Sequence, residues 1–276
     1  MAQAAPAKAA PTTAQSGTPS NIFSLLVVPI ALAVALLLYF FVLGAPGNFV
    51  GGDPHNNPKD GNMLATIYKG GVIVPILLTA ALTVLTFIIE RFLTIFRAKG
   101  SGAVDPFLKK VKYLLESGDV ENAIRECDKQ KGSVANVVRA GLTKYREMEG
   151  ATSMDKDQKV LAIQKELEEA TSLELPMLEK NLVFLATIAS VATLMGLFGT
   201  VLGMIRAFAA LATAGSPDAV ALANGISEAL INTALGIGTS AVAIIMYNYF
   251  TTQIDGLTYR IDEAGYSIAQ TFASKH

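Results

Sequence analysis

Four long apolar stretches limit what this chain can fold into. They cover residues 22–43, 71–92, 182–211 and 220–250, and a helix of about 20 apolar residues is enough to cross a bilayer. Unpaired backbone groups are costly in lipid, so a spanning segment must be a helix or part of a closed barrel. The sequence therefore predicts an all-α, polytopic membrane protein with four transmembrane helices. Its composition, 51% hydrophobic and 16% charged, agrees with this class.

The first of these stretches has two interpretations. A cleaved signal peptide would be shorter, would follow a more basic leader than one with Lys8 alone, and would end at a small-x-small site. Residues 22–43 lack these features, which favours an uncleaved helix. Residues 1–20 are rich in Ala, Pro, Thr and Gln without an apolar period, a composition typical of a disordered tail.

Basic residues predict the orientation of the helices, because Lys and Arg are retained on the cytoplasmic side. Fifteen of the 22 Lys and Arg residues lie in 96–180, so this region and both termini are expected inside. The predicted segments are a tail (1–20), an extra N-terminal transmembrane helix (21–44), a periplasmic loop (45–70), a second transmembrane helix (71–95), a cytoplasmic helical region (96–180), a helical hairpin (181–250) and a cytoplasmic C-terminal helix or tail (251–276).

The predicted cytoplasmic region contains helices at 107–115, 120–130 and 134–148, with Asp119 as an N-cap. A long helix from Gln158 is expected to run into the third span, with a kink at Pro176. We interpret this region as a solvated helical extension. The sequence has no phosphate-binding glycine loop and no metal-ligand spacing. We therefore expect no enzymatic activity, no cofactor and no metal, and the net charge of −1 gives no sign of nucleic-acid binding.

The third stretch carries small residues at steps of three and four. Such a stripe lets two helix backbones approach closely in lipid, and Gly196, Gly199 and Gly203 are its expected packing positions. Packing alone explains the glycines. It does not explain why Thr187 and Thr200 lie on or beside the same stripe.

Glu228 is the only ionisable acid or base in 220–250. Glu228, Asn232 and Gly236 share one helical face, so the acid belongs to a polar seam. Acids within spans usually face a bundle interior or an ion path, although Glu228 is near enough to the end of its span to be interfacial. Desolvation penalises the charged form of a carboxyl group, which suits reversible protonation.

Arg206, in the outer part of the third stretch, has three possible environments. Its side chain can extend outward to water, pair with an acid such as Asp218, or bind lipid headgroups. The sequence does not decide among these alternatives.

Two signatures give the chain a resemblance to a known family. Residues 181–190 (NLVFLATIAS) with 195–204 (MGLFGTVLGM), followed by 225–236 (GISEALINTALG), resemble the ExbB/TolQ/MotA proton-channel family, closest to the ExbB type. Two features differ: Thr193 follows Ala192 where the family commonly has Ala-Pro, and 22–43 is an additional span.

The resemblance implies a function and a set of partners. ExbB-like proteins form pentamers in the bacterial inner membrane around a dimer of ExbD-like single-span helices, and proton flow through the complex drives TonB-like proteins. Residues 181–250 would then be the pore-forming hairpin, with Thr200, Glu228 and Thr233 lining the proton pathway. Thr233 lies about 140° from Glu228 on an ideal helix, so Asn232 is the better neighbour on geometry alone. Self-association and membrane lipids complete the expected contacts.

Other functions are also compatible with parts of the sequence. A TolQ-like subunit of the Tol-Pal envelope system is the close alternative, because the motifs do not separate it from the ExbB type. A MotA-like stator, an intramembrane enzyme and a passive scaffold are less favoured. The spans have no histidine, and only Glu90 is available as a second acid.

Overall fold

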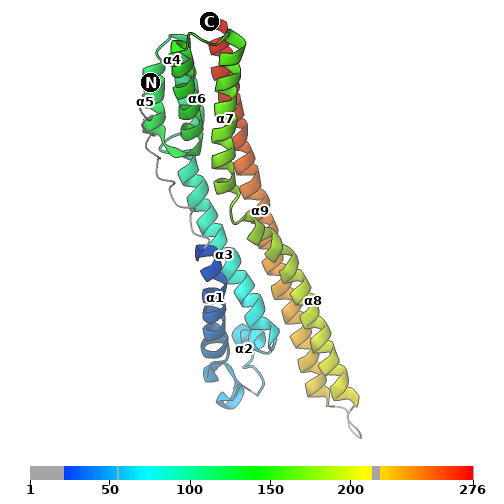
Figure 1. The fold of residues 1–276 in the computed structure, drawn as a ribbon. Helices are drawn as coiled ribbons and strands as arrows, with labels where there is room; N and C mark the ends of the chain where they lie inside the picture. Colours follow the sequence, from blue (N-terminus) through cyan, green and yellow to red (C-terminus); the bar gives the residue numbers. More distant parts are fainter. Residues whose placement is uncertain (1–21, 55, 213–217, 276) are drawn as a thin grey trace, which may run out of the picture.

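The computed structural model describes residues 22–54, 56–212 and 218–275, and over these residues the protein is an elongated assembly of helices (Figure 1). A single isolated β-bridge joins Phe49 and Pro58. The predicted tail 1–20 and the centre of the hairpin turn lie outside the described residues. The helices are α1 (Ile22–Leu37), η1 (Leu38–Leu43), η2 (Pro46–Asn48), η3 (Val50–Gly52), α2 (Met63–Tyr68), α3 (Ile73–Lys99), α4 (Val104–Glu116), α5 (Val120–Gln130), α6 (Gly132–Gly150), α7 (Lys156–Glu179), α8 (Leu182–Ala212) and α9 (Ala219–Lys275).

The prediction of four apolar helices is confirmed. Within the described residues, four helices are long and apolar enough to cross a membrane, and each overlaps one of the four predicted stretches. The protein is therefore a multi-pass membrane protein. The helix that contains the fourth stretch is longer than its apolar part: α9 has 57 residues, or roughly 85 Å at 1.5 Å per residue. The predicted C-terminal segment 251–276 is thus a continuation of the last span as far as Lys275.

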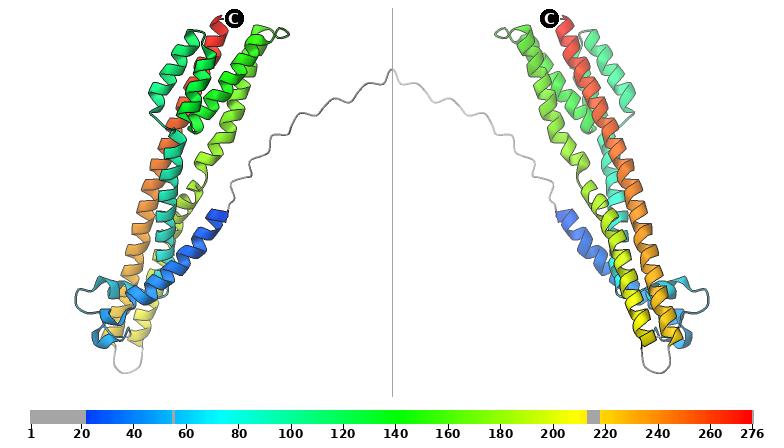
Figure 2. Two further views of the ribbon diagram at one scale, coloured as in Figure 1. Left: turned by 90° about the vertical axis from the view of Figure 1, so that its left-hand side faces the viewer. Right: turned by 90° about the vertical axis from the view of Figure 1, so that its right-hand side faces the viewer.

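The helices form two parts that share α9. In the first, α8 and the N-terminal half of α9 lie side by side as an antiparallel pair, which we call the hairpin (Figure 1); α3 packs against this pair, and α1 packs against α3. In the second, α4, α6 and α7 pack against the C-terminal half of α9, and α5 packs against α4 and α6; we call this group the bundle. The views in Figure 2 place the bundle and the C-terminal end of α8 at opposite ends of the molecule.

The bundle packs on a hydrophobic core that is continuous with that of the spanning helices, so it is more than the solvated extension predicted for 96–180. Tyr145 of α6 is 1% exposed and meets Phe272 of α9 edge to face, with ring centroids 4.8 Å apart. Leu115 and Ile163 are also buried there. The apolar face of α9 continues past the predicted span at helical spacing, which gives the shorter helices a surface to pack on.

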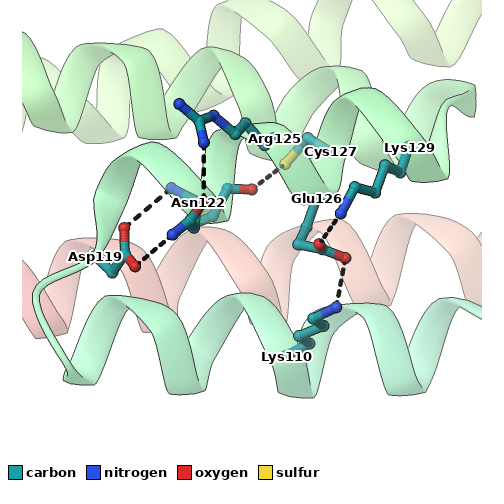
Figure 3. Close-up of polar contacts among 8 residues, drawn as sticks. Lys110, Asp119, Asn122, Arg125, Glu126, Cys127 and Lys129 are labelled. Carbon is teal, nitrogen blue, oxygen red and sulfur yellow. Dashed lines mark hydrogen bonds and ion pairs between the residues drawn. The ribbon is translucent and has the colours of Figure 1, made fainter.

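Local sequence signals fix the short helices of the bundle. The Asp119 carboxylate accepts a hydrogen bond from the backbone N–H of Asn122 at 3.1 Å, so the predicted N-cap of α5 is confirmed. Gly118 precedes it with a φ of 84°, a conformation that glycine adopts without strain. Figure 3 shows this cap and the ion pair between Lys110 of α4 and Glu126 of α5, at 2.8 Å.

The predicted continuous helix from Gln158 into the third span is wrong. The helix containing Pro176 ends at Glu179, and α8 begins at Leu182. Asn181 lies between them with a φ of 69°, which breaks the helical path. Arg91 of α3 lies at this junction and is only 1% exposed, and its guanidinium donates to the Leu178 carbonyl oxygen at 2.9 Å.

Candidate functional site

The hairpin is held together by direct contact between the backbones of α8 and α9. A Cβ added to Gly203 would lie 2.7 Å from the nitrogen of Ala229 and the oxygen of Gly225. At Gly196 the added Cβ would lie 3.0 Å from the backbone carbonyl oxygen of Asn232, and at Gly199 it would overlap the Asn232 side chain. All three predicted packing glycines therefore face α9. Only small residues allow this approach, and it fixes which residues of the two helices stand opposite each other.

Glu228 lies inside this arrangement and is 7% exposed. Its Oε1 accepts a hydrogen bond from Arg206 Nη1 of α8 at 2.5 Å. On the other side is Gly71, at the start of α3, where an added Cβ would be 2.6 Å from the same oxygen. The carboxylate is therefore enclosed by α8, α9 and the turn before α3, and the single chain is enough to cover it.

Of the three environments considered for Arg206, the structure shows pairing with an acid. The acid is Glu228, whereas Asp218 was the example named, and the Arg206 side chain is 54% exposed while that of Glu228 is 9% exposed. One signal in the sequence points to the pair. Arg206 and Glu228 lie at similar distances on either side of the hairpin turn, so an antiparallel hairpin brings them close together.

Asn232 continues the polar face one turn further along α9, as predicted. Its side chain is fully buried, and its Nδ2 donates to the Gly70 carbonyl oxygen at 2.8 Å. Its Oδ1 is buried and has no hydrogen-bond partner among the described residues. Buried polar atoms without a partner are few in natural proteins, and a functional role is one of the explanations for those that occur. Here the arrangement leaves an acceptor one helical turn from the acid.

The two threonines implied by the resemblance form a separate contact. The hydroxyl groups of Thr200 and Thr233 meet across the hairpin, and Thr233 also donates to the Ala229 carbonyl at 3.1 Å. The structure thus divides the four candidate pathway residues into two pairs. Glu228 and Asn232 face the turn before α3, whereas Thr200 and Thr233 bridge α8 and α9, as the angle between positions 228 and 233 requires.

The ion pair depends on the charge of the carboxylate. The Arg206 guanidinium compensates the charge of Glu228, which is enclosed mostly by protein. An uncharged side chain at position 228 would remove this attraction and leave the partly exposed Arg206 without its partner.

A second acid–base pair lies far from this site. Arg91 Nε donates to Glu90 Oε2 at 2.6 Å, close to the α7–α8 junction, and the pair joins α3 to Leu178. The partners of Arg91 and Glu90 hold helices together: Arg91 binds the Leu178 carbonyl oxygen, and Glu90 accepts a hydrogen bond from Thr94 of the same helix. Among the described residues, no group of three or more His, Cys, Asp or Glu side chains is arranged to hold a metal ion.

Fold and site together define a class: a multi-pass helical membrane protein with a carboxylate buried in a tightly packed hairpin. Residues 129–263 match the MotA/TolQ/ExbB proton channel family. This range includes α6, α7, the whole hairpin and most of α9. This part of the chain therefore matches that proton channel family, which confirms the resemblance found in the sequence.

Individual relatives divide between two branches of the family. The Tol-Pal system protein TolQ of Pseudomonas aeruginosa is 35% identical over 127 residues, which cover 46% of this chain and 55% of TolQ. The biopolymer transport protein ExbB of Pseudomonas putida is 28% identical over 201 residues, covering 72% of this chain and 60% of that protein. A putative ExbB homologue of Methanothermobacter thermautotrophicus is 29% identical over 200 residues, which cover 71% of this chain and 65% of that protein. In each case this chain spans less than two thirds of the relative's length.

Proposed function

We propose that this protein is a proton-channel subunit that converts proton flow across the bacterial inner membrane into mechanical work, with Glu228 as the group that takes up and releases protons. The ion pair between Glu228 and Arg206 carries this proposal. A buried carboxylate is costly in a membrane hairpin, and this one has a cation that compensates it only while it is ionised. Each protonation therefore changes the forces on α8 and on the turn before α3.

The work is done on a partner, because a single carboxylate has no second moving part. We propose an assembly of several copies, a pentamer, around a dimer of ExbD-like single-span helices that carries a second acid. Two observations support self-assembly. Apolar side chains on α8 such as Leu194, Ile205 and Phe208 are 59–62% exposed, and such exposed surface in a membrane hairpin faces lipid or other helices. Thr200 and Thr233 are only half-buried in the single chain, so both are available to line a shared pore.

Two downstream systems are possible, and each has an observation in its favour. A TonB-type role agrees with the longer alignments, since one relative named ExbB and one putative ExbB homologue match over 72% and 71% of this chain. A Tol-type role agrees with the higher identity of the relative named TolQ. We favour the ExbB-like role, with transport across the outer membrane driven through a TonB-like protein. Both termini and the bundle are proposed to be cytoplasmic, in agreement with the distribution of Lys and Arg.

The decisive experiment is Glu228→Gln, with Asp255→Asn as its control. Asp255 is an exposed acid on the same helix. Each variant is purified with its single-span partner, and the intact complex is weighed by native mass spectrometry. It is then tested for proton flux in liposomes and for uptake of a TonB-dependent substrate in cells. We expect Glu228→Gln to assemble normally and to lose both activities, while Asp255→Asn keeps them.

Retention of flux and uptake by Glu228→Gln would show that this side chain does not carry protons. Loss of assembly would instead assign Glu228 a structural role. Co-purification tests with a TonB-like and a TolA-like protein, run in parallel, separate the two downstream systems.

A further inference from the structure

The additional N-terminal helix ends in a distorted segment that contacts the Glu228 site. At Leu38 the α-helix α1 gives way to a π-helical segment, Leu38–Leu43. Such segments are rare and are often found at functional sites. Tyr39 follows the buried Ala35 by four residues and is only 9% exposed, while Phe41 is 75% exposed.

Tyr39 holds the turn that precedes α3 by two contacts. Its ring stacks on that of Tyr68, with centroids 4.6 Å apart and an interplanar angle of 21°. Its hydroxyl donates to the Tyr68 carbonyl oxygen at 3.2 Å. That same oxygen accepts the backbone N–H of Gly71, also at 3.2 Å, so it closes the turn Tyr68–Gly71. The Tyr39 hydroxyl therefore donates a hydrogen bond to the same Tyr68 carbonyl oxygen that closes the turn.

The turn Tyr68–Gly71 in turn covers the acid. The carbonyl oxygen of Gly70 accepts from Asn232, and Gly71 lies against the Glu228 carboxylate. Gly71 has a φ of 73°, which favours glycine, and an added Cβ would also be 3.3 Å from Arg206 Nη1. No larger residue fits between this turn and the ion pair.

An apolar cluster joins the same elements away from the polar contacts. Tyr39, Leu43 and Val74 are buried together, and Leu235 of α9 packs against them. The first helix is therefore connected to α9 through the turn Tyr68–Gly71 and through this cluster, on the side of the acid that α8 does not cover.

From this geometry we infer that the additional N-terminal helix positions the proton site: Tyr39 holds the turn Tyr68–Gly71 against Glu228 and restricts access to its carboxylate. Tyr39 is a positioning residue, since it acts through the turn. The inference rests on the proposed role of Glu228, but the contacts that carry it are independent of that role. It gives the first span a function within this chain, beyond anchoring.

The test measures how fast Glu228 reacts with dicyclohexylcarbodiimide, an apolar reagent that modifies protonated carboxyl groups. The full-length protein in liposomes is labelled at a fixed pH, and each modified acid is quantified by peptide mass spectrometry. The variants are Tyr39→Ala, which removes both contacts, Tyr39→Phe, which keeps the stacked ring, and Phe41→Ala, an exposed control in the same segment. Glu90, in its own buried pair with Arg91, is the internal reference.

We expect Tyr39→Phe to raise the labelling rate of Glu228 by about fivefold, the factor expected when one hydrogen bond of ordinary strength no longer holds the turn closed. Tyr39→Ala should give a larger increase, because it also removes the stacked ring. Phe41→Ala should match the unsubstituted protein, and the rate at Glu90 should stay constant in every variant.

Two results would overturn the inference. One is an unchanged rate at Glu228 in Tyr39→Ala. The other is a parallel rise at Glu228 and Glu90, which would mean general loosening of the protein. The labelling needs no energy transduction, so it is separate from the test of the proposed function. If Glu228→Gln stayed active while Tyr39→Ala exposed the acid, the positioning would stand and the carrier role would fall.

Discussion

Gly236 offers the sharpest test of how α8 and α9 pack. Replacing it by alanine would place a Cβ 2.6 Å from the Ala192 carbonyl oxygen and 2.7 Å from the Gly196 Cα, whereas ordinary contacts begin at 3.4 Å. Both atoms belong to the backbone, so the helices must separate to admit the methyl group. Overpacking of this kind costs about 1–3 kcal/mol, and the better helix propensity of alanine returns up to about 1 kcal/mol.

Gly238→Ala provides the matched control, because an added Cβ there meets nothing within 4 Å. Both glycines are inside α9, so the gain in helix propensity is the same and cancels in the comparison. Gly236→Ala should be less stable than Gly238→Ala by about 1–3 kcal/mol. The measurement is the free energy of unfolding in mixed micelles titrated with sodium dodecyl sulfate. Equal stability of the two variants, within about 0.5 kcal/mol, would refute the backbone contact.

Three further predictions concern charge and burial. In a double-mutant cycle with Arg206→Gln and Glu228→Gln, the coupling energy should be favourable and about 0.5–3 kcal/mol in unfolding experiments; a value near zero would mean that the pair does not form. Burial raises the pKa of the Cys127 thiol to about 12, so a maleimide should label Cys127 slowly at neutral pH and quickly after unfolding; fast labelling of the folded protein would contradict its buried position. Hydrogen bonds from Asn122 lower the pKa of Asp119, so this carboxylate stabilises the fold above its unfolded pKa, and thermal unfolding of Asp119→Ala should approach that of the unsubstituted protein as the pH falls through the folded pKa; a difference that persists at low pH would point to a cause other than charge.

The transmembrane helices follow from the sequence because one property, apolar length, decides them. Residues 182–211 were predicted as a span, and α8 is Leu182–Ala212. The short helices were also predictable where a local signal marks their ends. The helix predicted at 120–130 matches α5, since Asp119 caps its start. In both cases the deciding interactions are local in the chain.

The bundle was not predicted, because its core forms between segments that are far apart in the sequence. Tyr145 and Phe272 are separated by more than a hundred residues, and neither helix identifies the other. The break at Asn181 was missed for a related reason. A proline at 176 predicts a kink, but the φ of 69° five residues later is set by packing at the junction, where Arg91 reaches Leu178.

The candidate site shows the same division. The face shared by Glu228 and Asn232 follows from helical spacing, and the structure retains it. Their partners do not follow from spacing, because Gly70 and Gly71 approach from a turn that precedes another span. The contacts of Tyr39 with Tyr68 have no clear signature in the apolar run 22–43, so a role for the first helix could not be predicted.

Packing and chemistry in the hairpin depend on one common feature, the register of α8 against α9. Gly203 and Gly225 let the backbones touch, and the contact fixes the register with little freedom to slide. A slip of one helical turn moves a residue by about 5.4 Å along the axis. This shift is larger than the 2.5 Å distance between Arg206 Nη1 and Glu228 Oε1. The ion pair therefore exists in only one register. The small residues of α8 have no reactive side chain, but by fixing the register they place Arg206 beside Glu228.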